Sequence, residues 1–242
     1  MTKAESKVID FIKKHILLFL LVAVTIIAIS LRVCGMDFQS DDFNSFLNSW
    51  WSIIKLNDFT GLATQVGNYN IPYQIIIYLM TLLPLNALYA YKIVSIIFDF
   101  VLAISTAMLV YSFVKNNRRL KAILAYSAVL LSATVIFNSS FWAQCDSIYT
   151  SFIILAILFL HKDKPIASFV FIGIAFAFKL QTVFIIPVLL YYWISTKKIS
   201  ILHFFIIPAV DVIMCLQLLW VDRLSISSQY MRNRPTTESL FR

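Results

Sequence analysis

The stretch Ile16–Val33, ILLFLLVAVTIIAISLRV, decides the fold class of this chain. It holds one charged residue, Arg32, and it is close in length to the roughly 20 apolar residues that a helix needs to cross a bilayer. Lysines between Lys3 and Lys14 precede it, as in a signal peptide, but no small-residue cleavage site follows it. We therefore interpret this run as a retained signal-anchor helix.

The composition of the whole chain agrees with a membrane location. Of its 242 residues, 60% are hydrophobic and 13% are charged, whereas soluble domains carry about 45–50% apolar and about 25% charged residues. The apolar runs are long and continuous, and the chain has only four glycines, which favours helices over a β-barrel. The sequence thus predicts an all-α integral membrane protein.

The net charge of +8 does not indicate a nucleic-acid partner. The basic residues fall in short clusters between apolar runs, which is the pattern of topology signals. The three cysteines, Cys34, Cys145 and Cys215, are too few and too scattered for a disulfide framework or a zinc site. We expect no metal and no cofactor.

Eight apolar segments could cross the membrane, but counting all eight places the basic loop 115–121 outside when the N-terminus is inside. Short basic loops face the cytoplasm, so one segment is not a span. Segment 71–85 is short and contains Pro72 and Pro84, which is typical of an interfacial or re-entrant segment. We expect about seven transmembrane helices, at 16–33, 88–114, 122–137, 148–160, 166–178, 182–194 and 201–221, followed by a polar tail at 222–242.

This topology separates the charges. The chain becomes a multi-pass protein of the cell membrane with a cytoplasmic N-terminus and a long first outer loop, from Gly35 to about Ala87, that carries interfacial helices and aromatic residues. Twelve of the 20 basic residues lie inside: Lys3, Lys7, Lys13, Lys14, Lys115, Arg118, Arg119, Lys121, Lys162, Lys164, Lys197 and Lys198. Acidic residues gather outside: Asp37, Asp41, Asp42, Asp58 and Asp146.

Three polar segments meet at the outer face in this topology: 40–43 (SDDF), 144–147 (QCDS) and 179–181 (KLQ). A carboxylate such as Asp41 or Asp42 can accept a proton from a hydroxyl nucleophile. A lysine and a glutamine, here Lys179 and Gln181, can hold a phosphate or a departing oxyanion. Together these groups suit transfer of a group from a phosphate-activated donor.

Each of these residues also has a structural interpretation. Asp41 and Asp42 could belong to a solvated loop, Asp146 could cap the helix that follows it, and Lys179 could extend to lipid headgroups. Asp99 lies within a predicted span, where an ionisable group is costly. It either pairs with Lys92 or lines a cavity.

The polar segments resemble those of a known superfamily. The stretch 141–150 (FWAQCDSIYT), the Lys-x-Gln element at 176–181 (FAFKLQ) and an outer helix introduced at 68–73 (NYNIPY) resemble GT-C polytopic glycosyltransferases, and more closely the bacterial GPI-mannosyltransferase-like proteins. The resemblance runs from about Phe11 to about Cys215. Taken together, the 141–150 and Lys-x-Gln elements are moderately specific.

The resemblance implies inverting transfer of a hexosyl or mannosyl group from a polyprenyl-phosphate-linked sugar donor to a glycan or lipid-linked acceptor at the extracytoplasmic face. The family's general base is an acidic residue followed by an aromatic one, which matches Asp42 before Phe43, with Asp41 as the fallback. Asp146 would orient the acceptor or the base. Donor and substrate contacts would come from Lys179, Gln181, Gln144, Tyr69 and Tyr73.

Family members continue through further spans, so the resemblance leads us to expect that this chain is truncated after about Val221. Two other interpretations stay open. A transporter or flippase for lipid-linked saccharides would need polar residues along its spans. An inactive fragment of a transferase, serving as an assembly partner, would show no turnover.

Overall fold

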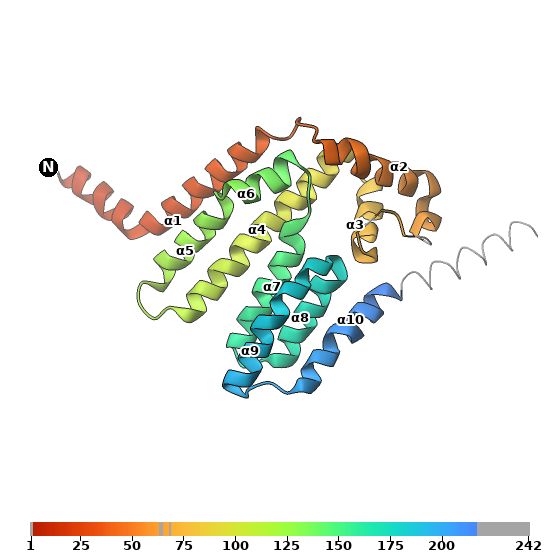
Figure 1. Ribbon diagram of the computed structural model, residues 1–242. Helices are drawn as coiled ribbons and strands as arrows, with labels where there is room; N and C mark the ends of the chain where they lie inside the picture. Colours follow the sequence, from red (N-terminus) through yellow and green to blue (C-terminus); the bar gives the residue numbers. More distant parts are fainter. Residues whose placement is uncertain (1, 63–64, 68, 217–242) are drawn as a thin grey trace, which may run out of the picture.

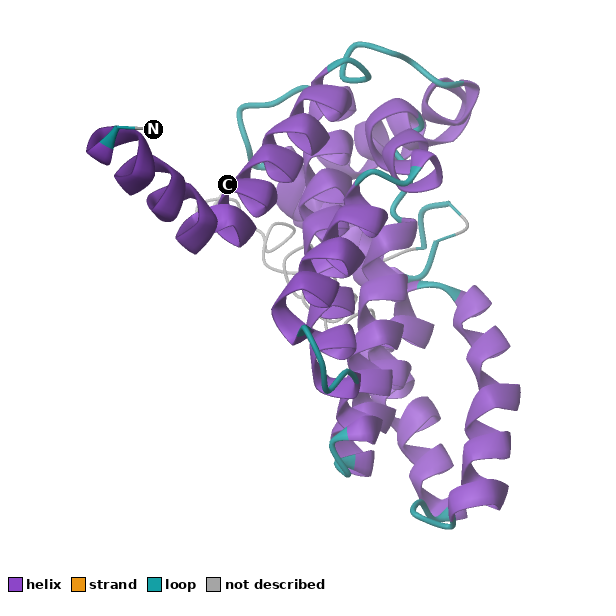
Figure 2. Cartoon of the chain, turned by 90° about the vertical axis from the view of Figure 1, so that its left-hand side faces the viewer, coloured by secondary structure: helices purple, strands orange, loops and turns teal. Residues whose placement is uncertain are grey.

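The computed structural model describes residues 2–62, 65–67 and 69–216, and this part of the chain contains helices and turns but no strand (Figure 2). The prediction of an all-α chain is confirmed for these residues. The last part of the predicted span at 201–221 and the predicted tail at 222–242 lie outside them. The helices are α1 (Lys3–Val33), α2 (Asn48–Asn57), α3 (Ile71–Thr81), α4 (Ala87–Phe113), α5 (Arg118–Leu130), α6 (Ala133–Ile136), α7 (Asp146–His161), α8 (Pro165–Phe178), α9 (Ile186–Thr196) and α10 (Ile206–Cys215).

Five shorter turns of other helix types join or extend these helices. Three are 3₁₀ turns, η2 (Asp58–Leu62), η4 (Leu180–Ile185) and η5 (Ile201–Phe205), and two are π-helical turns, η1 (Phe43–Leu47) and η3 (Phe137–Phe141). Isolated π-helical turns are rare and occur frequently at functional sites. Both stand at the end of the bundle that carries the polar segments.

Local sequence accounts for several helix starts. Thr2 and Glu5 form a reciprocal capping box at α1, and the Asn86 side chain accepts a hydrogen bond from the Tyr89 N–H at α4. Helices α3, α8 and α9 have a proline in the first turn, where its missing N–H costs nothing. Pro72 therefore begins α3 rather than breaking it, and α3 ends at Thr81, before Pro84.

Helix α4 is the centre of the bundle. It packs against α5 on one side and α7 on the other, α1 packs against α5, and α8 lies between α7 and α10. The turns that follow α4, α7 and α9 lie at one end of the bundle, whereas α2 and α3 lie at the other (Figure 1). The N-terminal turns of α1 extend away from the bundle in both views.

Two of the described helices, α1 and α4, are long and apolar enough to cross a membrane. A third joins them if α5 and the segment 133–141 count as one span bent by 50°. The other apolar helices are shorter. Large apolar side chains stay exposed along these helices, such as Ile26, Ile97 and Ile213, and an apolar exterior of this extent is expected where lipid replaces water. These features are those of a helical membrane protein.

Candidate functional site

A cleft of about 570 Å³ opens beside α2 and the start of α3. Its lining comes from four segments that are distant in sequence: residues between 42 and 50, residues 69–70, residue 144, and residues between 178 and 184. Five of the residues predicted from the sequence line it: Asp42, Tyr69, Gln144, Lys179 and Gln181. The three polar segments thus meet in one cleft.

Asp42 reaches the cleft because a helix begins immediately before it. The Ser40 hydroxyl accepts a hydrogen bond from the Phe43 N–H at 3.1 Å and donates to the Trp142 carbonyl at 3.3 Å. Asp41 and Asp42 then occupy the first turn, where the helix dipole favours negative charge. They lie on a helix and not in the loop of the structural interpretation, but both are exposed to solvent. Only Asp42 lines the cleft.

A chain of hydrogen bonds orients the Asp42 carboxylate. The Tyr69 hydroxyl donates to Gln144 Oε1 at 2.5 Å, and Gln144 Nε2 donates to Asp42 Oδ2 at 2.9 Å. This order fixes which way the amide points, because a carboxylate only accepts. Burial, followed by the nearby Cys145 and Asp146, raises the pKa of Tyr69 well above its ordinary value, so its hydroxyl remains a donor.

Asp146 does not line the cleft but holds a residue that does. Its carboxylate forms an ion pair with Lys179 and accepts a hydrogen bond from Asn138 Nδ2 at 3.0 Å. The N-cap residue of α7 is Cys145, and Asp146 lies in the first turn of the helix instead of capping it. The Lys179 ammonium also lies over the rings of Tyr69, at 5.4 Å, and Tyr149, at 5.7 Å. These contacts hold the Lys179 side chain at the cleft.

Tyr73 lies beneath the cleft and does not line it. Its side chain is 1% exposed and packs among Trp50, Trp51 and Tyr91 in an aromatic-rich core, with its hydroxyl at the Cys145 thiol. Burial raises the pKa of Cys145 to about 12. Tyr73 therefore does not contact the space inside the cleft, contrary to the prediction from the sequence, but belongs to the buried aromatic residues beneath it, which form the floor of the cleft.

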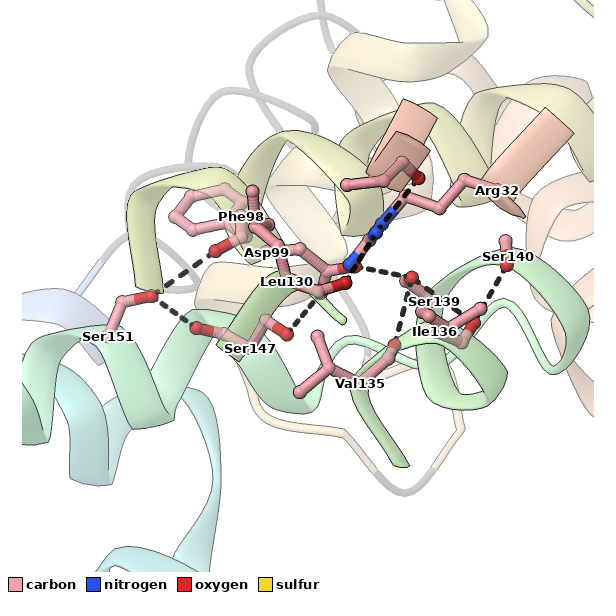
Figure 3. Close-up of polar contacts among 11 residues, drawn as sticks. Arg32, Phe98, Asp99, Leu130, Val135, Ile136, Ser139, Ser140, Ser147 and Ser151 are labelled. Atoms are coloured by element: carbon pink, nitrogen blue, oxygen red, sulfur yellow. Dashed lines mark hydrogen bonds and ion pairs between the residues drawn. The ribbon is translucent and has the colours of Figure 1, made fainter. Parts of the chain in front are cut away.

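Behind the cleft lies a buried charge network that the sequence did not reveal (Figure 3). Arg32 Nε donates to Asp99 Oδ2 at 2.9 Å, and the Ser139 and Ser147 hydroxyls each donate to Asp99 at 2.5 Å. Arg32 also donates to the Leu130 carbonyl at 3.0 Å. The pairing of Asp99 with Lys92 was therefore wrong, and the signal for the correct partner was the lone arginine in the first apolar run.

This network supports the site, because its members are sequence neighbours of the site residues. Ser147 follows Asp146, and Ser139 follows Asn138, which binds Asp146. Arg32 and Asp99 are 1% and 0% exposed. A buried pair of opposite charges with additional hydrogen bonds holds α1, α4, η3 and α7 in one arrangement.

Lys92 fixes the segment of the chain that leads to Asp42. Its ammonium donates to the carbonyl oxygens of Gly35 at 2.7 Å, Met36 at 3.0 Å and Phe38 at 2.5 Å. These carbonyls follow the end of α1, where a cation is favourable. Lys92 thereby fixes the path of the chain from α1 to Ser40.

The rim of the cleft is apolar. Leu180 and Phe184, on η4, are 60% and 78% exposed, and Trp50 and Phe46 form part of the facing wall. A pocket with a few convergent polar groups and apolar walls is the usual form of a small-molecule site. In this cleft a carboxylate, an ammonium and three side-chain amides adjoin a surface that accepts hydrocarbon. Among the described residues, no group of three or more His, Cys, Asp or Glu side chains gathers to hold a metal.

The chain was compared with protein-family models, curated proteins and solved structures. None of the three comparisons gives a match.

Proposed function

We propose that this chain is a multi-pass membrane glycosyltransferase that moves a sugar from a polyprenyl-phosphate donor to an extracytoplasmic glycan or lipid-linked acceptor. The convergence of Asp42, Lys179 and Gln181 in one cleft with an exposed apolar rim carries the proposal. A lipid-linked sugar phosphate has the same division into a polar head and a hydrocarbon tail. Leu180 and Phe184 would contact the tail while the sugar enters the cleft.

The proposed step is inverting. Asp42 accepts the proton of the acceptor hydroxyl, whose oxygen forms the new bond to the sugar C1 as the bond from C1 to the phosphate oxygen breaks. Polyprenyl phosphate departs with the bonding electrons, and Lys179 and Gln181 stabilise its charge. Gln144 and Tyr69 orient the base. Asp146 acts as a positioning residue for Lys179.

The proposal includes about seven membrane crossings, formed by α1, α4, α5 with α6, α7, α8, η4 with α9, and η5 with α10. Helices of 14 and 16 residues, such as α8 and α7, are shorter than the roughly 20 residues of a full crossing. The ends of α7 and α8 next to the cleft would therefore lie just beneath the outer headgroups. The polar groups of the cleft would then be within reach of a lipid phosphate. The N-terminus and the basic turns would face the cytoplasm.

A transporter is the alternative from another functional class. It needs a polar path through the spans, and the polar residues available for one included Ser95, Asp99 and Ser105. All three are buried, and none lines the cleft or the second cavity described below. Asp99 is instead bound by Arg32 and two serines. These contacts favour the transferase.

The test is sugar transfer by the purified chain in liposomes, with polyprenyl-phosphate mannose or glucose and a lipid-linked acceptor. Asp42→Asn keeps the size of the side chain and an oxygen for Gln144, but it removes the base, so we expect transfer to fall about 10²–10⁴-fold. Asp41→Asn is the matched control and should leave transfer unchanged, because Asp41 lies outside the cleft. Full transfer by Asp42→Asn would remove Asp42 as the base. Donor binding without turnover by the unchanged chain would favour the inactive fragment.

A further inference from the structure

A second cavity, of about 780 Å³, lies toward the opposite end of the bundle from the cleft. It is bounded by α1, α4, α5 and the turn after α7, through residues such as Leu21, Met108, Ile123 and His161. The proposed transfer reaction does not use it. Its lining divides into two chemically different parts.

One part is apolar and follows α4 toward the middle of the bundle. The lining residues of α4 run from Ile104 to Ser112, which is roughly 12 Å along a helix axis. Ile104 and Met108 are exposed on this side. A hydrocarbon chain lying along α4 would cover both of them.

The other part is cationic. Arg118 and Lys162 line the cavity together with His161, and its lining contains no acidic residue. An adjoining smaller pocket shares Arg118 and adds Lys115 and Arg119, again without an acidic side chain. The sequence contains no Asp or Glu between Asp99 and Asp146.

Arg118 is oriented for an anion. Its guanidinium lies 4.7 Å from the centre of the Tyr111 ring, and Nε donates to the Tyr111 carbonyl at 3.4 Å. The side chain is exposed. Guanidinium groups bind phosphate through their remaining N–H donors. The centre of the His161 ring lies 3.9 Å from the centre of the Phe113 ring, on which it stacks, and His161 forms part of the cavity wall.

We propose that this cavity binds one anionic glycerophospholipid, with its phosphate at Arg118 and Lys162 and an acyl chain along α4 over Ile104 and Met108. Basic pockets between membrane helices bind anionic headgroups, and both the apolar length and the charge of this cavity fit such a lipid. The inference requires that α1 and α4 cross a membrane, but it does not depend on sugar transfer.

The experiment is native mass spectrometry of the delipidated full chain after addition of dioleoylphosphatidylglycerol or dioleoylphosphatidylcholine. We expect the chain to retain one phosphatidylglycerol and to prefer it to phosphatidylcholine. The double variant Arg118→Gln/Lys162→Gln should bind it about tenfold more weakly or worse, because each basic residue near the headgroup contributes to the attraction. The control Lys164→Gln/Lys197→Gln removes the same charge from nearby turns outside the cavity and should bind normally.

A steric variant keeps the test decisive if the charge variant folds poorly. Met108→Trp fills the apolar part and leaves every charge in place, so it should also lose the lipid. Equal retention of both lipids, unchanged binding by Met108→Trp, or equal loss in the control pair would overturn the proposal. Displacement of the lipid by inorganic phosphate alone would show a phosphate site instead, and a lipid-free dimer would show that a second copy covers the cavity.

Discussion

Arg32 and Asp99 place opposite charges inside an apolar bundle, 1% and 0% exposed. Each charge is costly to bury alone, and the ion pair with its serine hydrogen bonds offsets that cost only while both partners are present. The value of the pair therefore lies in the arrangement that it enforces: four helical segments meet where Asp146 and Asn138 are held.

We predict that Asp99→Asn lowers stability by about 3–5 kcal/mol, because it leaves Arg32 buried without a counter-charge. The double variant Arg32→Met/Asp99→Asn should recover part of this loss. Asp163→Asn makes the same chemical change in the exposed pair with Lys198 and should have little effect. Thermal unfolding in detergent measures all three. An unchanged melting temperature for Asp99→Asn would contradict the role of the pair.

Cys145 provides a residue-scale test of the floor beneath the cleft. Its burial raises the pKa of the thiol to about 12, so at pH 9 only about one thousandth of it is thiolate, the form that reacts with maleimide. Cys34 is exposed. In a Cys215→Ser background, maleimide at pH 9 should label Cys34 and leave the buried Cys145 unlabelled. Labelling of Cys145 in the folded chain would show that the reagent reaches this side chain and that the residues beneath the cleft do not exclude it.

At the scale of elements, apolar runs predicted most helix positions. The run 88–114 became α4 (Ala87–Phe113), and 166–178 became α8 (Pro165–Phe178). The bends and irregular turns of the helices depend on contacts between helices, which cannot be read from the sequence. The run 122–137 bends by 50° after Leu130, and the π-helical turns η1 and η3 depend on how the chain packs beside the cleft. The same limit applies to Tyr73, whose aromatic character fitted a substrate contact and a buried floor equally well.

Gly67 allows the loop before α3 to lie against the cleft wall. Its φ of 78° is in the left-handed region, and a Cβ there would stand 2.2 Å from Trp50 Cε2. We predict that Gly67→Ala costs about 2–4 kcal/mol, from backbone strain and overpacking together. It should also weaken transfer, because Trp50 lines the cleft.

Gly61→Ala is the matched control for Gly67→Ala. Gly61 does not have a positive φ, and its added Cβ would approach no atom closer than 3.2 Å. The melting temperature of Gly61→Ala should therefore fall less than that of Gly67→Ala. Equal shifts for the two variants would show that Trp50 moves aside without cost.

For the molecule as a whole, basic side chains predominate at one end of the bundle, where Asp163 pairs with Lys198. The turns after α4, α7 and α9 carry lysines and arginines, and the opposite end carries Asp37, Asp41 and Asp42. Orientation in a membrane follows short basic loops, so all three basic turns should face the cytoplasm. That arrangement requires α7, α8 and α9 to cross in spite of their length.

Cysteines placed in the three turns test the seven crossings one hairpin at a time. In a Cys34→Ser/Cys215→Ser background we predict that Asn116→Cys, Lys164→Cys and Lys197→Cys react with a membrane-impermeant maleimide only after spheroplasts are permeabilised. In a separate chain that keeps Cys34 and carries only Cys215→Ser, Cys34 at the end of α1 should react without permeabilisation. Labelling of Lys164→Cys alone in intact spheroplasts would show that α7 and α8 enter and leave at one face. Labelling of all three, with Cys34 protected, would reverse the orientation and place the cleft at the cytoplasmic face, where an extracytoplasmic acceptor could not reach Asp42.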